Sequence, residues 1–258
     1  MEVNALISRE CFCGVMGDAS SGGSLVDTFG KQITLTDGER RELARLDQRE
    51  RSVRRGGIIQ RERDRAAELF VLRRGMMMSY LLLDDGGRQI LRFFYPGDIM
   101  GLSGAIYRET PETLCAVTEC AVAAFDRAAL AQLIDRHSRL ALVLLAINHA
   151  ERVAITDRLA AVGRASAKAR VAGLLLELSE RLGDHGSFNL PLTQEEIGDA
   201  TGLTSVHVNR MMRQLEQDGL IERDGSRVTL RDVRALTRES GFTDRLKGLD
   251  LGWLPPGR

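Results

Sequence analysis

The segment 205–217 carries the residues best placed to do chemistry in this sequence. Its apolar residues recur at helical spacing, so one face of a helix is predicted to pack inward; they are Val208, Met211, Met212 and Leu215. The other face gathers hydrogen-bonding side chains, namely Ser205, His207, Asn209, Arg210 and Arg213. An α-helix fits the DNA major groove, where such side chains can bond to base edges. The segment therefore predicts a helix that reads a DNA sequence.

Neighbouring elements would hold this helix in place. A shorter helix precedes it across a turn at Gly202, and Thr193 with Glu196 three residues later predicts a capping box at its start. That helix N-terminus can also receive a DNA phosphate. An Asp-Gly pair within 220–230 separates two short strands and predicts a hairpin. The order helix, turn, helix, hairpin indicates a winged helix-turn-helix; the alternative is a helical hairpin with a solvated polar face.

Length and composition limit the class of protein. A chain of 258 residues favours two domains, and 43% hydrophobic with 28% charged residues is ordinary for a soluble globular protein. The 36 basic and 36 acidic residues balance, which argues against indiscriminate coating of nucleic acid but not against a local DNA reader. No stretch is long and apolar enough to span a membrane, and the N-terminus lacks a signal-peptide pattern. We expect a cytoplasmic protein with reduced cysteines and no membrane partner.

The chain changes character along its length. Short strands separated by glycine and proline turns run from about residue 52 to 125 and predict a small sandwich or barrel. Residues 1–30 contain a small, polar, linker-like stretch and are expected to be weakly structured. Outside the winged segment, helices are predicted at 37–48, 127–136, 139–163 and 166–182.

The helix predicted at 139–163 has an apolar stripe along one side. Its residues are Leu140, Val143, Leu144, Ile147, Ala150, Ala154 and Ala161. Such a helix can lie on the barrel, or it can pair with its twin as a parallel coiled coil in a homodimer. We favour the dimer, with contacts at Leu140, Leu144, Ile147 and Ala154.

A barrel with the turn Pro96-Gly97-Asp98, a long helix and a winged helix-turn-helix together resemble the Crp/Fnr family of bacterial transcription regulators, over about residues 37–236. The resemblance implies an α+β fold with an N-terminal β-barrel or jelly-roll sensor domain. The implied boundaries are a flexible N-terminal extension 1–30, a cyclic-nucleotide-binding-like β-roll sensor domain 31–137, a dimerisation helix 138–164, a winged helix-turn-helix DNA-binding domain 165–241 and a C-terminal tail 242–258.

The resemblance implies a homodimeric regulator, not an enzyme, that reads a palindrome in double-stranded DNA. An activator of this kind would also contact RNA polymerase. In well-known members a Glu and an Arg on the reading helix recognise a G·C pair; the Arg matches Arg210, whereas Val206 stands at the Glu position. Arg210 can still bond to guanine, but Val206 can contact only a thymine methyl, so half-sites should differ from the common TGA core. The base-reading set is Ser205, Val206, His207, Asn209 and Arg210, and the phosphate set is Thr193, Gln194 and Arg213.

The effector pocket departs from that of the cyclic AMP receptor. That protein uses a Glu for the ribose and an Arg-Ser pair for the cyclic phosphate. The matching positions here fall at Leu102 and at Thr110-Pro111, and an apolar residue cannot replace either group. We therefore expect an effector other than cyclic AMP, whose identity stays open. The pocket is predicted to include Gly101, Leu102, Ser103, Arg108 and Thr110.

Four cysteines raise the alternative of an iron–sulfur or thiol redox sensor with the same fold. Iron–sulfur members of the family hold a cluster through four thiolates, and this chain has Cys11, Cys13, Cys115 and Cys120. The first pair lacks the wider spacing of those members, and Cys115 and Cys120 are better explained as small core residues, so a cluster or thiol redox sensor is not favoured.

A second alternative to the DNA-binding regulator is a ligand-binding or scaffold module whose winged domain contacts protein rather than DNA.

Overall fold

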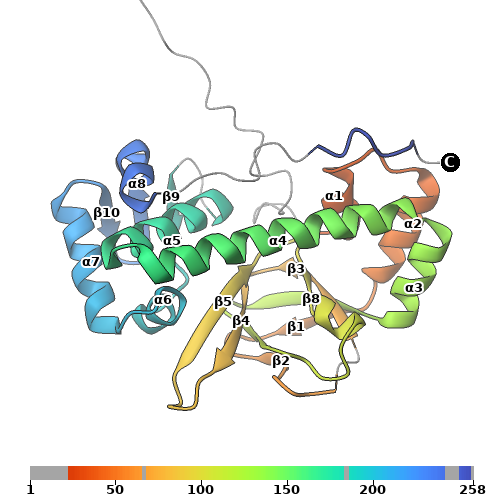
Figure 1. Ribbon diagram of the computed structural model, residues 1–258, viewed down its shortest axis with the longest axis horizontal. Coiled ribbons are helices and arrows are strands. Elements are labelled where there is room, and N and C mark those ends of the chain that lie inside the picture. Colours follow the sequence, from red (N-terminus) through yellow and green to blue (C-terminus); the bar gives the residue numbers. More distant parts are fainter. Residues whose placement is uncertain (1–22, 66–67, 183–185, 242–249, 257–258) are drawn as a thin grey trace, which may run out of the picture.

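The computed structural model describes residues 23–65, 68–182, 186–241 and 250–256. A β-roll lies on one side of the long helix α4 (Arg139–Arg164), and a smaller domain rich in helices gathers around the far end of that helix (Figure 1). This α+β architecture agrees with the predicted fold class. No described helix is long and apolar enough to cross a membrane.

Two four-stranded antiparallel sheets build the roll. One has the order β1 (Glu50–Val53), β8 (Cys120–Asp126), β3 (Glu68–Arg74) and β6 (Ile99–Met100); the other has the order β2 (Ile58–Gln60), β7 (Thr113–Ala116), β4 (Met77–Leu82) and β5 (Arg88–Phe94). Buried apolar side chains fill a core cluster shared by the two sheets, among them Leu72, Met77, Phe94, Leu114 and Val122. Because the sheets remain separate, the roll is a jelly-roll-like sandwich and not a closed barrel.

Residues 23–30 were predicted to belong to a flexible N-terminal extension, but in the structure they are folded and contain a helix. Helix α1 (Leu25–Gly30) begins at the N-cap Ser24 and buries Leu25 and Phe29, which lie one helical turn apart on one face. The Thr28 hydroxyl donates to the Gly97 carbonyl at 2.8 Å and fixes the helix to the roll. The remaining part of the predicted extension lies outside the described residues.

Helices α2 (Asp37–Leu46) and α3 (Arg127–Arg136) pack beside α1 against the first sheet. Residues 250–256 of the tail join them, since Leu254 is buried in the same cluster and Arg139 donates to the Pro255 carbonyl at 3.2 Å. The sequence offered no basis for placing this tail, and the structure shows that its described part packs onto the roll.

Helix α4 has two apolar sides instead of the single predicted stripe. Leu140, Val143 and Ile147 are buried against the roll and its N-terminal helices. A second apolar set is exposed, consisting of Leu142, Leu145, Ile155 and Leu159. Among the four predicted dimer contacts, Leu140 and Ile147 are therefore used inside the protomer, Leu144 is half-buried, and Ala154 is exposed.

The C-terminal domain contains α5 (Ala167–Leu182), α6 (Gln194–Thr201), α7 (Ser205–Gln217) and α8 (Val233–Ser240). Its sheet has the order β10 (Ile221–Asp224), β11 (Arg227–Leu230) and β9 (Ser187–Asn189). The predicted hairpin joins β10 to β11 through Gly225, whose φ of +58° suits a glycine. The predicted order of helix, turn, helix and hairpin is thus confirmed.

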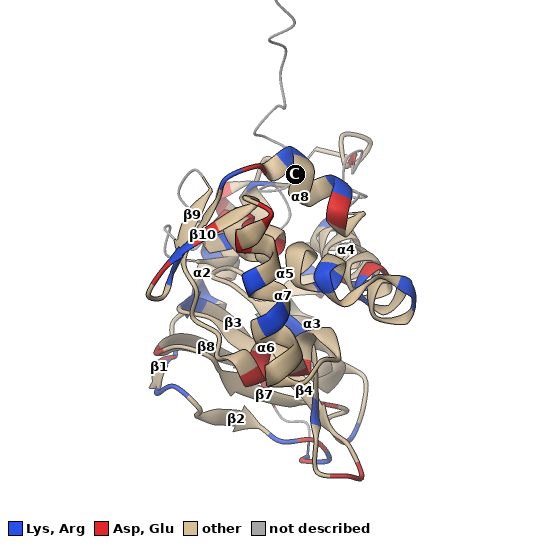
Figure 2. Ribbon diagram, turned by 90° about the vertical axis from the view of Figure 1, so that its left-hand side faces the viewer, with Lys and Arg blue, Asp and Glu red and all other residues tan. Residues whose placement is uncertain are grey.

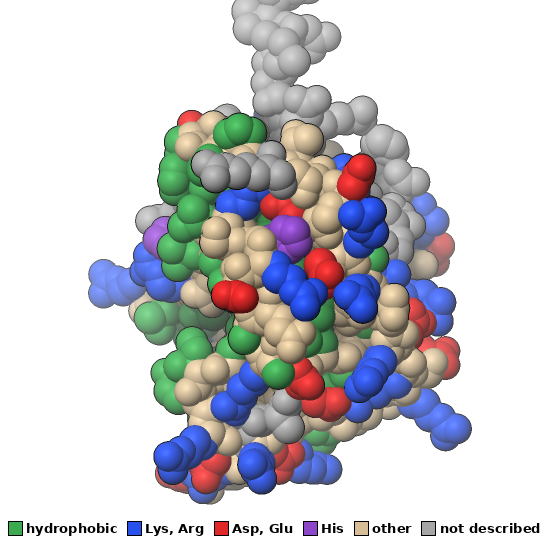
Figure 3. All heavy atoms as spheres, turned by 90° about the vertical axis from the view of Figure 1, so that its right-hand side faces the viewer, with side chains coloured by type: hydrophobic (Ala, Val, Ile, Leu, Met, Phe, Trp, Pro, Cys, Tyr) green, Lys and Arg blue, Asp and Glu red, His purple; other side chains and the backbone are tan. Residues whose placement is uncertain are grey.

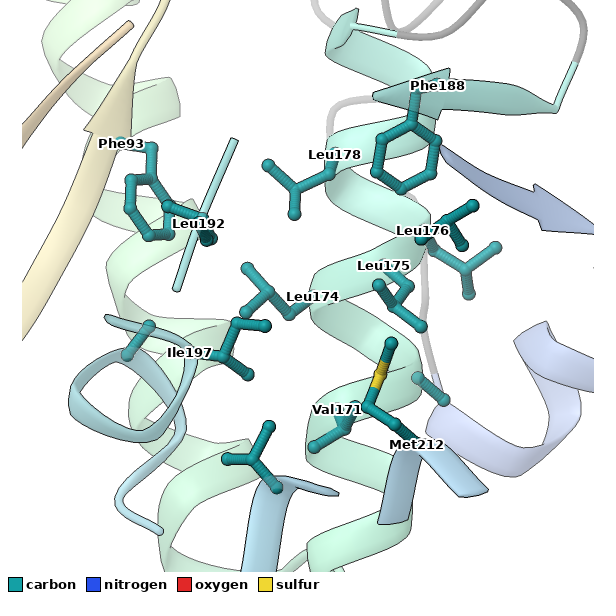
Figure 4. Packing of buried hydrophobic residues seen from close by; sticks show 14 of the residues in the cluster. Phe93, Val171, Leu174, Leu175, Leu176, Leu178, Phe188, Leu192, Ile197 and Met212 are labelled. Carbon is teal, nitrogen blue, oxygen red and sulfur yellow. The ribbon is translucent and has the colours of Figure 1, made fainter. Parts of the chain in front are cut away.

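One hydrophobic cluster joins the two domains. It contains Met78, Tyr80 and Phe93 from the roll together with Leu174, Leu192 and Ile197 from the C-terminal domain. Figure 4 shows Phe93 on its roll strand and Leu192 ahead of α6, with Leu174 and Leu178 projecting from α5. The roll and the C-terminal domain therefore share an interior in this structure.

Candidate nucleic-acid interface

Helix α7 is anchored by one face and exposes the other. Val208, Met212 and Leu215 are completely buried and Met211 nearly so, which confirms the predicted packing face. The predicted DNA-reading side chains are all exposed: Ser205, Val206, His207, Asn209, Arg210 and Arg213. Figure 2 shows α7 at the front of one end of the molecule, with basic positions along it. A rigid helix thus presents polar side chains to solvent.

The turn before α7 depends on two glycines. Gly202 ends α6 in a left-handed conformation with φ +66°, which a residue with a Cβ adopts only with strain. A Cβ on Gly198 would lie 2.4 Å from the Leu203 carbonyl oxygen, so the backbone of the turn passes too close to α6 for any side chain there. These glycines set the angle at which α7 leaves α6.

The N-terminus of α7 is capped by Thr204, a residue whose role sequence reasoning missed. Its hydroxyl accepts from the His207 backbone N–H at 3.3 Å and lies 3.3 Å from His207 Nδ1. A threonine immediately before a helical pattern is a recognisable N-cap signal. Because Nδ1 contacts Thr204, Nε2 is the ring atom of His207 that remains available to a ligand.

Arg210 and Arg213 make no ion pair with any other residue in the described part of the chain. Other arginines of this domain are engaged: Arg223 pairs with Glu216 at 2.5 Å, and Arg227 donates to the Ser187 hydroxyl at 2.8 Å. The opposite end of the molecule shows basic and acidic side chains intermixed (Figure 3). Two unpaired guanidinium groups on an exposed helix are suited to bind an anionic partner.

The start of α6 combines the predicted cap with two acids. Thr193 accepts from Glu196 N–H at 3.1 Å while Glu196 accepts from Thr193 N–H at 2.7 Å, so the capping box is confirmed. Glu195 also lies in this first turn, and the carboxylates oppose the attraction of the helix N-terminus for a phosphate. Gln194 keeps a buried oxygen without a hydrogen-bond partner. The role of Thr193 and Gln194 in phosphate contact stays a prediction.

The roll holds α6 through polar contacts that the sequence did not reveal. Arg88 of β5 pairs with Asp199 at 2.8 Å, and Gln89 donates to the Asp199 carbonyl at 2.8 Å. Arg55 donates to the Pro191 carbonyl at 2.9 Å and pairs with Glu196 at 3.1 Å. The first helix of the helix-turn-helix is therefore bonded directly to the roll.

The residues predicted to form an effector pocket have different surroundings in the structure, and their role as a pocket stays a prediction. Gly101 begins the short 3-10 helix η1 (Leu102–Ala105) with φ +71°, Leu102 is half-buried against the core, and the Ser103 hydroxyl lacks a partner. The Thr110 hydroxyl donates a hydrogen bond to the Arg61 carbonyl, and Arg108 is exposed. A cavity of about 280 Å³ lies elsewhere, between β5, α4 and α5.

Cys115 and Cys120 are buried in the roll, where the sequence placed them. Burial raises the pKa of both thiols, and Cys120 donates to the Met76 carbonyl at 3.2 Å. Cys115 and Cys120 each belong to a buried hydrophobic cluster, which agrees with the predicted role of small core residues. Cys11 and Cys13 lie outside the described residues, and within those residues no group of three or more His, Cys, Asp or Glu side chains could hold a metal ion.

Two family models match this chain. The cyclic nucleotide-binding domain matches residues 50–137, and the Crp-like helix-turn-helix domain matches residues 169–239. Both matches fall on the domains described above.

Similar proteins extend over most of the chain. The nitrogen fixation regulation protein FixK of Azorhizobium caulinodans is 35% identical over 183 residues, which cover 68% of this chain and 73% of that protein. The fumarate and nitrate reduction regulatory protein of Escherichia coli (strain K12) is 23% identical over 215 residues, 82% of this chain and 86% of that one. The structure of FixK2 from Bradyrhizobium japonicum matches with a TM-score of 0.71 and 31% identity, covering 76% of this chain and 98% of that one.

Proposed function

The chain belongs to the Crp/Fnr family of DNA-binding transcription regulators, and from that premise we propose that it acts as a homodimer on a palindromic site. One observation carries the proposal: α7 is fixed by four buried apolar residues while its opposite face leaves Arg210 and Arg213 exposed and without ion-pair partners. A regulator of chromosomal DNA works in the cytoplasm, and its relatives are transcription regulators rather than enzymes.

Base reading is assigned to the first half of α7. Arg210 supplies two parallel donors for guanine O6 and N7, the contact that best distinguishes guanine in the major groove. Val206 is 79% exposed, and a valine methyl held at this place contacts a thymine methyl instead of a cytosine amino group. The half-site is therefore predicted to differ from the TGA core at the position facing Val206. Ser205, His207 and Asn209 complete the base-reading set.

The dimer is assigned to the exposed stripe of α4. Leu145 and Leu159 are 64% and 72% exposed, and they lie two heptads apart, the repeat that a parallel helix pair uses. Leu142 and Ile155 extend the same apolar surface. Pairing through this stripe would leave two α7 helices related by a two-fold axis, suited to half-sites about 34 Å apart.

A random-library DNA selection followed by binding titrations tests the proposal. The parent should select a palindrome. Arg210→Ala should lose about 1–3 kcal/mol of binding free energy and relax specificity at one base pair of each half-site. The matched variant Arg213→Ala should weaken binding about equally for all sequences and lower the slope of log K against log salt by about 1.

The outcomes distinguish a sequence-specific regulator from a scaffold module. A palindrome with the two contrasting arginine effects supports the regulator. Equal and sequence-independent losses from both variants would remove Arg210 from the base-reading set. Absence of salt-dependent binding to any duplex would contradict the proposal and favour a scaffold module. Activators would be distinguished by adding RNA polymerase to the same DNA.

A further inference from the structure

The cavity between β5, α4 and α5 lies where the roll, the long helix and the C-terminal domain meet. Its volume of about 280 Å³ is near the lower end of the roughly 300–1,000 Å³ typical of small-molecule sites. Apolar side chains form part of the wall, including Phe93, Ala161 and Leu174. A ligand here would contact β5, α4 and α5, and α5 packs directly against α7.

Arginines from all three elements line this cavity. Arg92 comes from β5, Arg158 from α4, and Arg181 from α5. Each already has an acidic partner: Arg92 pairs with Glu151 at 2.7 Å, Arg158 pairs with Glu177 at 2.6 Å, and Arg181 donates to Asp98 at 3.3 Å. These pairs hold the guanidinium groups in place without using all of their donors.

Unused donors concentrate at this cavity. In the described part of the chain, eleven buried side-chain polar atoms lack a hydrogen-bond partner, and five belong to residues that line the cavity. They are Arg92 Nη2, Tyr95 Oη, Arg170 Nε, Arg181 Nε and Arg181 Nη1. Four of the five are obligate donors, and the tyrosine hydroxyl can donate as well. Unpaired buried donors are unfavourable, so an acceptor that reached them would be bound strongly.

Burial strengthens the case for Tyr95 and Arg181. They are only 1% and 3% exposed, and the Arg181 guanidinium lies over the Tyr95 ring at 4.3 Å from its centroid. Arg92 Nη2 is 3.9 Å from Asp98 Oδ2, a distance that gives electrostatic attraction but no hydrogen bond. The cavity lining holds four arginines against three carboxylates, which belong to Glu151, Asp157 and Glu177.

We propose that the cavity binds a small organic anion, whose apolar body packs against Phe93, Ala161 and Leu174 and whose oxyanion head accepts hydrogen bonds from Tyr95 and Arg181. These donor atoms have almost no accessible surface as they stand. Binding therefore requires the side chains of both Tyr95 and Arg181 to shift until these atoms reach the ligand. The site differs from the pocket predicted near Gly101, since none of the residues predicted for that pocket lines this cavity.

Such a ligand would act on DNA binding by joining β5, α4 and α5. This regulatory consequence rests on the proposed function, whereas ligand binding itself does not. The two are measured separately, with binding followed in the absence of DNA.

Octanoate is a suitable probe because it combines an apolar chain with a carboxylate head. Isothermal titration calorimetry on the full chain should show saturable binding of one octanoate per chain and a higher melting temperature. Octanol and octylammonium, which keep the chain but replace the head, should bind at least about tenfold more weakly. Equal binding of all three would overturn the proposal, because it would show that the cavity does not recognise an anion.

Two variants connect binding to the cavity. Tyr95→Phe removes one unpaired hydroxyl, so it should weaken octanoate binding about tenfold or more while leaving the melting temperature of the free protein unchanged or higher. Ala161→Phe fills the cavity and should abolish binding; the matched control Ala131→Phe, at an exposed position of α3, should bind like the parent. Parent-like octanoate binding by both Tyr95→Phe and Ala161→Phe would overturn the site.

DNA affinity is then compared with and without octanoate. A change of several fold in the parent, lost in Tyr95→Phe, supports the regulatory role. Octanoate binding without any change in DNA affinity would refute that role and leave the ligand site standing. A protein that binds octanoate but no DNA would contradict the proposed function alone.

Discussion

Arg139 joins the start of α4 to the N-terminal part of the chain, and replacing it with methionine gives the sharpest test of how α4 is positioned. Its Nε donates to Glu39 Oε1 at 2.6 Å and its Nη2 to Glu39 Oε2 at 2.7 Å. Nη2 also donates to the Thr34 carbonyl at 2.6 Å. The Glu39 side chain is 3% exposed, so its carboxylate depends on this arginine for compensation.

The magnitude follows from the pKa of Glu39. Hydrogen bonding from Arg139, the largest influence, lowers this pKa from 4.5 to about 2 despite the opposing effect of burial. That difference corresponds to about 3 kcal/mol of stability at pH 7. Arg139→Met should therefore reduce the free energy of unfolding by about 3 kcal/mol and the melting temperature by about 6–12 °C.

The pH dependence tests the electrostatic cause. Because the folded pKa of Glu39 lies below the unfolded value, its contribution is complete above pH 4.5 and is lost as the pH falls toward 2. The difference between parent and Arg139→Met in urea unfolding should shrink by about 1.4 kcal/mol per pH unit below that point.

A matched arginine on the surface provides the control. Arg136 pairs with Glu42 at 3.2 Å but its side chain is 53% exposed, so Arg136→Met should change stability by less than about 1 kcal/mol. A loss from Arg139→Met that stays constant between pH 5.5 and about 3 would refute the reasoning and assign the effect to packing of the arginine stem.

Three other predictions concern different parts of the chain. Burial raises the pKa of Asp47 to about 6, so the parent should lose about 1.4 kcal/mol of unfolding free energy per pH unit as the pH rises from about 4 to 6. Asp47→Asn should remove that pH dependence in urea titrations. An unchanged slope in the variant would place the titrating group elsewhere. Leu159→Lys should shift sedimentation from dimer to monomer, whereas Leu82→Lys, at an exposed position outside α4, should not. If both variants remain dimeric, the exposed stripe of α4 is not the dimer interface. Thr204→Ala should lower stability by about 1 kcal/mol through loss of the α7 cap, measured by thermal unfolding, and parent-like melting would argue against the cap.

Local signals predicted the DNA-reading part of the molecule well. The spacing of Val208, Met211 and Leu215 fixed the buried face of α7, and the pairing of Thr193 with Glu196 fixed the start of α6. Both signals act within one or two helical turns, where backbone geometry determines which side chains meet. No contact with the rest of the fold is needed to interpret them.

The orientation of α4 was harder to predict because the helix is apolar on two sides. Leu140 and Leu145 are equally hydrophobic, yet the first is buried against the roll and the second is 64% exposed. Periodicity shows that a face is apolar but not which partner covers it. The distinction requires the position of the roll, which a single sequence does not provide.

Contacts between residues far apart in the sequence could not be predicted, because a single sequence does not show which distant elements meet. Asp98 and Arg181 are 83 positions apart, and Arg88 and Asp199 join strands to helices of another domain. No local rule relates such residues, so the cavity bounded by these elements could not be anticipated. Helix α1 is different, since Ser24 and the pair Leu25 and Phe29 offered a short capping and packing signal that was overlooked.

The shared interior of the roll and the C-terminal domain limits how the chain can be divided. Tyr80 and Phe93 on one side and Leu192 and Ile197 on the other belong to the same cluster, so a cut near residue 165 would expose both halves of it to water. A fragment carrying only the DNA-reading helices would be prone to self-association. Heating the intact protein would melt both domains in one calorimetric transition, with the roll acting as a folding partner for the segment that carries the helix-turn-helix.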